Sequence, residues 1–155
     1  MKKIIAMTML IVMLLSLTAC GSAAADDGKY TIGICQLVTH DALDAATNGF
    51  MQAVKDQLGD ENVEFDLQNA AGDANTCASI VNAFVASNVD LIMANATAAL
   101  LAAQSATNAI PILGTSVTDY GSALGIADWT GTVGSNISGT SDLAPLDGQA
   151  AMLHE

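Results

Sequence analysis

The chain has 155 residues, with 16 acidic against 4 basic side chains, a formal net charge of −12 and an apolar fraction of 52%. This length suits one domain with a substantial core, and the apolar fraction is too high for a disordered chain. The sequence has no arginine, and an acidic surface repels phosphate, so the composition excludes nucleic-acid binding and a basic patch for anionic lipid.

The first twenty residues have the pattern of an export signal. Lys2 and Lys3 form a positive start, and an apolar run follows that ends in Leu-Thr-Ala directly before Cys20. This ending is typical of bacterial lipoprotein signals, in which the cysteine is acylated. We therefore predict a signal peptide over residues 1–20, lipidation at Cys20 and a flexible tether over 21–28. The protein is then extracytoplasmic and anchored to the cell membrane; an ordinary signal peptide and an uncleaved anchor are the alternatives.

The next segments alternate between strand and helix patterns. Residues 30–36 form a short β-rich run, and residues 41–58 carry apolar side chains at helical spacing with polar ones between them. Gly59 ends this helix. Residues 63–67 alternate strictly between apolar and acidic side chains, which is typical of a half-buried strand near a sheet edge.

Two more strand–helix units follow. Asp73 caps a predicted helix that buries Ile80, Val81, Phe84 and Val85. Residues 90–94 are a continuous apolar run, typical of a central parallel strand. An alanine-rich helix is predicted over 97–108 and a fourth strand over 110–114.

The spacing of the strands predicts the fold class. They begin at residues 30, 63, 90 and 110, so 33, 27 and 20 residues separate successive starts. Parallel strands need crossovers of this size, and we predict an α/β doubly wound parallel sheet with helices on both faces. Past Thr115 the sequence is rich in Gly, Ser and Thr, which indicates loop with one short strand near Ile137. Residues 147–155 have a helical pattern.

Ligands of open α/β sheets bind beyond the carboxyl ends of the strands. In this chain those ends are rich in hydroxyls and amides and lack a glycine-rich phosphate motif, so no nucleotide cofactor is predicted. His40 with Asp41, Asp44 and a serine is an alternative catalytic set, but the chain has no Gly-x-Ser-x-Gly elbow. His40 is therefore interpreted as a lining or first-turn residue. No metal spacing is present, and no cofactor is expected.

Five further residues have open roles. Thr97 is either a helix N-cap alone or a ligand contact as well, and Asp119 and Asp142 either accept from a ligand amine or form turns. Cys35 and Cys77 lie in apolar surroundings and are interpreted as buried thiols, although an exported protein can pair them.

The chain resembles substrate-binding lipoproteins of ABC importers with a type I periplasmic-binding-protein fold, in the tryptophan/tyrosine-binding group. The similarity covers residue 30 to about residue 155 in order along the chain. It rests on Ile32-Gly33-Ile34, Gln36-Leu37-Val38, His40, Ala42-Leu43-Asp44, Gln68-Asn69-Ala70, Gly72-Asp73, Val89-Asp90-Leu91-Ile92, Ala96-Thr97-Ala98-Ala99, Ile110-Pro111-Ile112, Val117-Thr118-Asp119, Asn136 and Gly139-Thr140-Ser141-Asp142. The family pattern has proline where Asp41, Ala98 and Tyr120 stand. The first two positions tolerate the change in a helical first turn, whereas Tyr120 is expected to alter a loop at the cleft mouth.

The resemblance implies a two-lobed solute-binding protein, of which residues 29–143 form the N-terminal lobe and residues 144–155 begin the crossover into a second lobe. It implies no enzymatic activity, hinge closure around a small amino-acid-like solute (aromatic amino acids among the candidates), and delivery to ABC permease subunits. A small exported α/β hydrolase and a lipoprotein sensor without a permease are the alternative functions. The implied ligand-binding residues are Gln36, Leu37, Thr39, His40, Ala96, Thr97, Ser116, Val117, Thr118, Asp119, Ser141 and Asp142.

Overall fold

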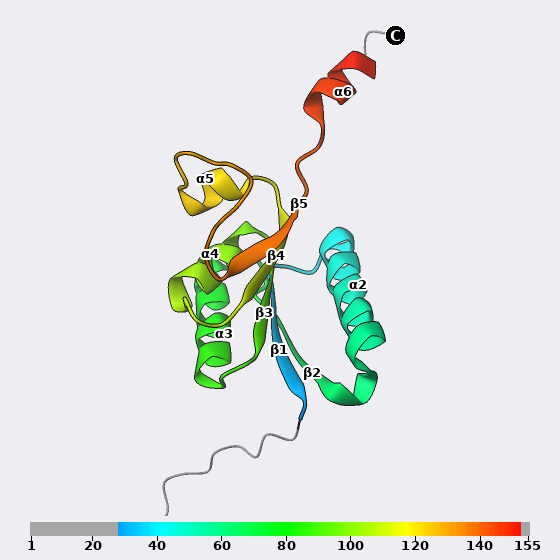
Figure 1. The fold of residues 1–155 in the computed structure, drawn as a ribbon, viewed down its shortest axis with the longest axis vertical. Helices are drawn as coiled ribbons and strands as arrows, with labels where there is room; N and C mark the ends of the chain where they lie inside the picture. The colour runs from blue at the N-terminus through cyan, green and yellow to red at the C-terminus, as the bar shows by residue number, and fades with distance from the viewer. Residues whose placement is uncertain (1–27, 153–155) are drawn as a thin grey trace, which may run out of the picture.

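The computed structural model describes residues 28–152. The predicted signal peptide, Cys20 and residues 153–155 lie outside the described residues. The described part forms a five-stranded sheet in the order β2-β1-β3-β4-β5, and every neighbouring pair is parallel. Figure 1 shows the sheet nearly edge-on, with α2 against one face and α3 and α4 against the other. The predicted α/β doubly wound fold is therefore confirmed.

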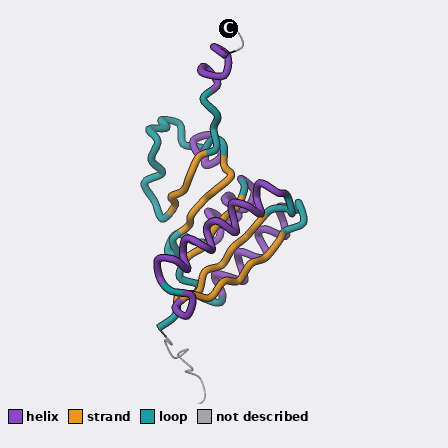
Figure 2. Tube along the Cα trace, turned by 90° about the vertical axis from the view of Figure 1, so that its right-hand side faces the viewer, coloured by secondary structure: helices purple, strands orange, loops and turns teal. Residues whose placement is uncertain are grey.

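The elements follow one another as strand and helix with few exceptions. The strands are β1 (Tyr30–Gln36), β2 (Val63–Asn69), β3 (Leu91–Asn95), β4 (Ile112–Val117) and β5 (Ile137–Ser141). The helices are α2 (Asp41–Leu58), the 3₁₀ turn η2 (Asp60–Asn62), α3 (Ala74–Ala86), α4 (Thr97–Ala106), α5 (Tyr120–Leu124) and α6 (Leu146–Met152). In Figures 1 and 2, α6 lies beyond the carboxyl ends of the strands, away from the layers.

Two hydrophobic clusters hold the layers together. Phe84, Val81 and Leu100 bring α3 and α4 onto Cys35, Ile92 and Ile112 of the sheet. Phe50, Met51 and Val54 of α2 pack against Ile32, Ile34 and Met93 on the opposite face. Burial of this apolar area is the main stabilising contribution to the fold.

Glycine is required where α3 crosses β1. A Cβ built on Gly33 would meet the Phe84 ring at 2.6 Å, so only glycine lets this ring lie flat on the strand. Phe84 is 1% exposed, and its burial therefore depends on the missing side chain of Gly33.

The structure differs from the sequence prediction mainly after residue 114. β4 continues to Val117, and the short helix α5 lies in a stretch predicted as loop. Asp119 caps α5 by accepting from the Ser122 N–H, and Gly125 ends it at φ 68°. A helix of five residues is too short to leave an apolar repeat, and its signals are only these two end residues.

Cys35 and Cys77 are buried free thiols, in agreement with the interpretation from sequence. Within residues 28–152, no helix is long and apolar enough to span a bilayer. The same residues contain no group of three or more His, Cys, Asp or Glu side chains that could hold a metal ion.

Candidate functional site

The polar loops at the carboxyl ends of the strands lie together along one edge of the sheet. Backbone hydrogen bonds join each loop to the next: Leu37 N donates to Asn95 O at 3.2 Å and Ala96 N donates to Thr115 O at 3.0 Å. On the far side, Ser141 Oγ donates to Thr118 O at 2.8 Å. The parallel register thus brings segments up to a hundred residues apart into one continuous rim.

The structure places every predicted ligand-binding residue on this rim. At the end of β1 lie Gln36, Leu37, Thr39 and His40, and at the start of α4 lie Ala96 and Thr97. At the end of β4 lie Ser116, Val117, Thr118 and Asp119, and at the end of β5 lie Ser141 and Asp142. Their side chains differ in access. Thr39, His40, Thr97, Thr118, Asp119, Ser141 and Asp142 are exposed.

Two of these side chains face the interior. Val117 is 0% exposed and belongs to the core against α3 and α4, so its side chain does not reach a solute at the rim. Gln36 is 4% exposed, and its amide is used within the protein. The sequence did not separate these residues from the accessible ones, because neighbouring positions in a strand end point to opposite faces.

His40 is the N-cap of α2. Its Nδ1 accepts from the Ala42 N–H at 3.2 Å, which satisfies one free donor of the first turn. Within the described residues, no serine hydroxyl hydrogen-bonds to His40. The geometry therefore gives His40 a capping role at the rim.

Asp119 and Asp142 differ in how much of their carboxylate is occupied. Both oxygens of Asp119 accept from Ser122, through its hydroxyl at 2.5 Å and its N–H at 3.1 Å. These bonds, the hydroxyl first, hold the pKa of Asp119 below its usual value. Asp142 is fixed at its backbone, where its N–H donates to Val117 O at 3.2 Å. Of the two carboxylates, Asp142 is the one that accepts no hydrogen bond from within residues 28–152.

The start of α4 is a second distinctive feature of the rim. Its N-cap is Ala96, not Thr97, and no side chain of the described part of the chain caps the helix. Ala96 adopts φ 94° and ψ 160°, a conformation that is essentially restricted to glycine. The first-turn N–H groups therefore point to the rim without a side-chain acceptor, and they carry the positive end of the helix dipole.

Sequence analysis missed a buried polar cluster below this rim, which we call the polar hub: Gln36, Thr47 and Asn95. Asn95 Nδ2 donates to Thr47 Oγ1 at 2.9 Å and to Leu43 O at 2.8 Å. Thr47 Oγ1 donates to Gln36 Oε1 at 2.7 Å, and Gln36 Nε2 donates to Asp44 Oδ1 at 2.5 Å. The hub ties the ends of β1 and β3 to the first turns of α2. An asparagine ending the apolar run of β3 was the available signal.

Tyr120 directly follows Asp119 of the rim, but its side chain points into the core rather than toward a solute. It is 5% exposed, its hydroxyl donates to Thr140 O at 3.3 Å, and its ring stacks on Trp129 with centroids 6.4 Å apart. Burial, followed by the charge of Asp142, raises the pKa of Tyr120. The residue is a core anchor between α5 and the β4–β5 pair.

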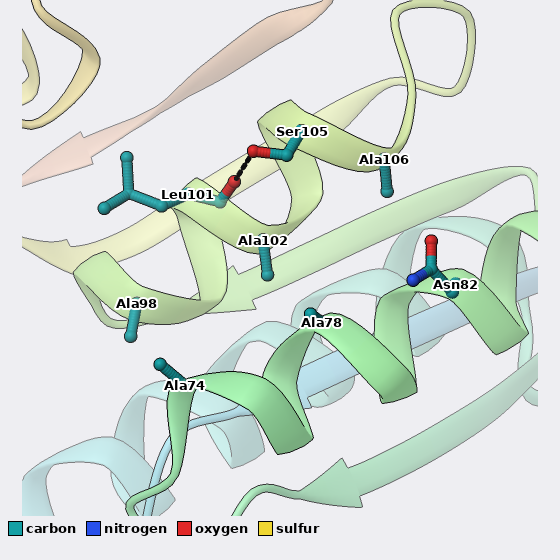
Figure 3. A pocket seen from close by; sticks show the side chains of 8 residues that line it. All are labelled: Ala74, Ala78, Asn82, Ala98, Leu101, Ala102, Ser105 and Ala106. Carbon is teal, nitrogen blue, oxygen red and sulfur yellow. Dashed lines mark hydrogen bonds between the residues drawn. The ribbon is translucent and has the colours of Figure 1, made fainter.

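Two cavities flank the rim. One of about 450 Å³ is lined by Gln36, Asp44, Thr47, Asn48, Leu67 and Asn69, and one of about 610 Å³ extends from Tyr120 and Trp129 to Ser141. A third of about 350 Å³ lies between α3 and α4 (Figure 3), where the small side chains of Ala74, Ala78, Ala98 and Ala102 face one another. The third cavity has no charged or aromatic lining residue, and Asn82 and Ser105 are its only polar ones.

Comparison with known proteins gives a consistent result. The family model described as ABC transporter substrate binding protein matches residues 31–155. A tyrosine-binding protein of Clostridioides difficile (strain R20291) is 41% identical over 144 residues, covering 84% of this chain and 41% of the relative.

Solved structures show the same relation. A ligand-free, open substrate binding protein with adhesive properties from Clostridium difficile superimposes with a TM-score of 0.74 at 41% identity, covering 81% of this chain and 43% of that one. An ABC domain from Streptococcus pneumoniae in complex with L-Trp has a TM-score of 0.73 at 28% identity, with 81% and 42% covered. The chain thus spans less than half the length of the relatives that it matches.

Proposed function

The chain belongs to the family of ABC transporter substrate-binding proteins, and from this premise we propose that it captures a small amino-acid-like solute outside the cytoplasm for an ABC permease. Aromatic amino acids are the foremost candidates, because one relative is named a tyrosine-binding protein and another structure holds L-Trp. The observation that carries the proposal is the continuous polar rim at the carboxyl edge of the sheet. The task is binding and release, with no bond chemistry.

The rim supplies a partner for each end of an amino acid. The lobe has no arginine, so a ligand carboxylate has no bidentate guanidinium to bind. The uncapped first turn of α4, with the hydroxyls of Thr97 and Thr118 nearby on the rim, can take that carboxylate instead. We assign the ammonium group to Asp142, because Ser122 already uses one acceptor site on each oxygen of Asp119.

High affinity requires a second wall. A pocket that binds tightly buries most of its ligand, whereas the rim described here is open. We propose that a second lobe, as in relatives of which this chain covers less than half, closes over the solute by a hinge motion. The segment after β5, which leads to α6, is the proposed start of that crossing.

Binding tests this function directly. The chain and a chimera that adds the remaining length of the 41%-identical tyrosine-binding protein are titrated calorimetrically with L-tyrosine, L-tryptophan, glucose and inorganic phosphate. We expect the amino acids alone to bind, with an affinity at least 100-fold higher for the chimera. Binding of glucose or phosphate alone would contradict the proposal, and equal affinity of the short chain would contradict the need for two walls.

The proposed roles of the two carboxylates are separated by a matched pair of variants. Asp142→Asn in the chimera removes the partner of the ammonium group and is expected to weaken binding about 10- to 100-fold, the range for losing a hydrogen-bonded charge. Asp119→Asn removes the same charge but keeps an acceptor that can cap α5, and it should leave affinity within a few-fold. The reverse ranking would assign the ammonium to Asp119.

The proposed membrane anchor depends on Cys20, which lies outside the described residues. One acyl chain binds membranes only marginally, so the diacylglycerol of a lipoprotein would be the effective anchor. In a bacterial host, Cys20→Ala should abolish incorporation of radiolabelled palmitate and release the protein from the membrane fraction. Persistent label in Cys20→Ala would show that Cys20 is not the lipidation site.

A further inference from the structure

Two thiols from distant parts of the chain meet in the core. Cys35 is on β1 and Cys77 is in the second turn of α3, and both are 0% exposed. Both belong to the same hydrophobic core cluster, in which the two thiols are close enough to interact electrostatically. Among residues 28–152 there is no third cysteine.

The backbone fixes both positions. Cys35 is held on both sides in the sheet, opposite Gln68 on β2 and Ala94 on β3. The Cys77 N–H donates to the backbone oxygen of Asp73 at 3.1 Å. Asp73 is also the N-cap of α3, since its Oδ1 accepts from the Thr76 N–H at 2.7 Å. Because neither backbone is free to move away, the two sulfur atoms remain neighbours whenever α3 is docked on β1.

We propose that Cys35 and Cys77 are joined by a disulfide when the chain folds outside a reducing compartment, a condition that rests on the export in the proposed function. The two S–H bonds are replaced by one S–S bond, with loss of two protons and two electrons. A disulfide of an extracytoplasmic thiol oxidase accepts them and leaves as a dithiol.

The bond forms during folding rather than afterwards. Only a thiolate attacks a disulfide, and burial, with Cys77 as neighbour, raises the pKa of Cys35 to about 12. Burial also raises the pKa of Cys77. In the folded, reduced protein both sulfurs are therefore protonated and shielded from an oxidant, whereas in the unfolded chain both are accessible.

The proposed bond links β1 to α3 and encloses α2 and β2 in the closed loop. Closing a loop of this length restricts the unfolded chain, and the melting temperature of the oxidised protein should rise by roughly 10 °C. The disulfide would strengthen the attachment of α3 to the sheet, in the same cluster as Phe84.

Oxidative refolding is the decisive experiment. The full chain carrying Cys20→Ser is unfolded and reduced, refolded in a buffer of reduced and oxidised glutathione, and then denatured and alkylated with iodoacetamide. We expect no alkylation and a mass two hydrogens lower, and the control Cys20→Ser/Cys77→Ser should add one alkyl group. The protein folded first under reductant and then given oxidised glutathione should add two. Two alkyl groups after oxidative refolding would overturn the disulfide.

A second measurement separates this proposal from the export on which it rests. The unaltered chain is produced in a bacterial host, alkylated before lysis, and fractionated into cytoplasm and envelope. An oxidised pair in the envelope fraction is expected. Refolding requires no export, so its failure overturns the disulfide alone. Protein found only in the cytoplasm overturns the proposed export alone, and exported protein with two free thiols overturns the disulfide.

Discussion

Asn95 is fully buried, and among residues 28–152 its Oδ1 has no hydrogen-bond partner, although its Nδ2 has two. An orphaned buried acceptor costs about 1–3 kcal/mol, so the rest of the polar hub must stabilise the fold enough to keep this residue in place. Thr47 is the central member, because it accepts from Asn95 and donates to Gln36. The hub therefore determines where α2 begins relative to β1 and β3.

Replacing Thr47 tests the hub. Thr47→Val keeps the shape of the side chain but removes two hydrogen bonds and leaves the Gln36 carbonyl unpaired, so the free energy of unfolding should fall by about 2–3 kcal/mol. Thr47→Ser retains the hydroxyl and should lose less than half as much. Urea unfolding followed by circular dichroism measures both. Equal losses would show that the methyl group contributes as much to stability as the hydroxyl.

The thiol of Cys35 makes the reduced protein sensitive to high pH. Its pKa is about 12 in the folded state, whereas an unfolded thiol has a pKa of about 8.5. The unfolded chain thus loses this proton first, so the free energy of unfolding falls as pH rises between these values, by at most about 1.4 kcal/mol per pH unit. Below pH 8 the group has no such effect.

The measurement compares the reduced protein with Cys35→Ala by urea unfolding at pH 7.5, 9 and 10. The variant removes this titration while other groups still titrate, so its stability should fall less steeply between pH 9 and 10. Parallel slopes for the two proteins would contradict a raised pKa at Cys35.

At the scale of elements, α4 begins with a strained residue. A non-glycine residue at the φ of Ala96 costs about 1–3 kcal/mol, and no capping side chain offsets it. Such strain is often found at binding sites, which agrees with the carboxylate-binding role proposed for this turn.

Ala96→Gly should therefore stabilise the protein by about 1 kcal/mol, even though glycine elsewhere is unfavourable. Ala102→Gly, in the interior of the same helix, is the control and should destabilise it by about 1 kcal/mol. Thermal melts of the two variants give the comparison. A loss of stability in Ala96→Gly would show that the turn is not strained.

The β4–β5 pair depends on a matched set of three residues. A Cβ on either Gly114 or Gly139 would collide with the Tyr120 hydroxyl, and the two glycines face each other in register. Tyr120 can therefore cross this pair only because both side chains are absent.

Gly114→Ala should destabilise the protein by about 2–3 kcal/mol, the range for overpacking a core. Tyr120→Phe removes the colliding oxygen, so the double variant should be more stable than the sum of the two single changes predicts. Urea unfolding of the three variants gives the coupling energy. Additive losses would show that the alanine clashes with something other than the hydroxyl.

At the scale of the whole molecule, the architecture could be predicted from sequence because its signals are long. The eighteen residues of α2 and the seven of β1 match their predicted bounds, since capping residues and periodic apolar positions agree there. The candidate site was predictable only as a set of strand ends. Val117 is buried and Asp119 caps a helix. These roles depend on tertiary packing, which the local sequence pattern does not contain.

The excess of acidic residues should make stability depend on salt. A net charge of −12 repels itself in the compact state, and the Debye length falls from about 30 Å at 10 mM salt to below 5 Å at 500 mM. The melting temperature should therefore rise by several degrees over this range of sodium chloride. Potassium chloride is the control and should act equally. An unchanged or lower melting temperature would show that charge repulsion is not a significant term.

Lys55 lies in the last turn of α2, where its Nζ is 2.6 Å from Asp60 Oδ1. Cleavage at this lysine can report how often the end of the helix opens. The sequence has no arginine, and Lys55 is the last lysine in the chain. Trypsin must therefore cut the last turn of α2 to cleave anywhere beyond residue 29, and a helical turn has to unfold before a protease can bind it. The rate at which one band becomes two on a gel then measures how often this turn opens.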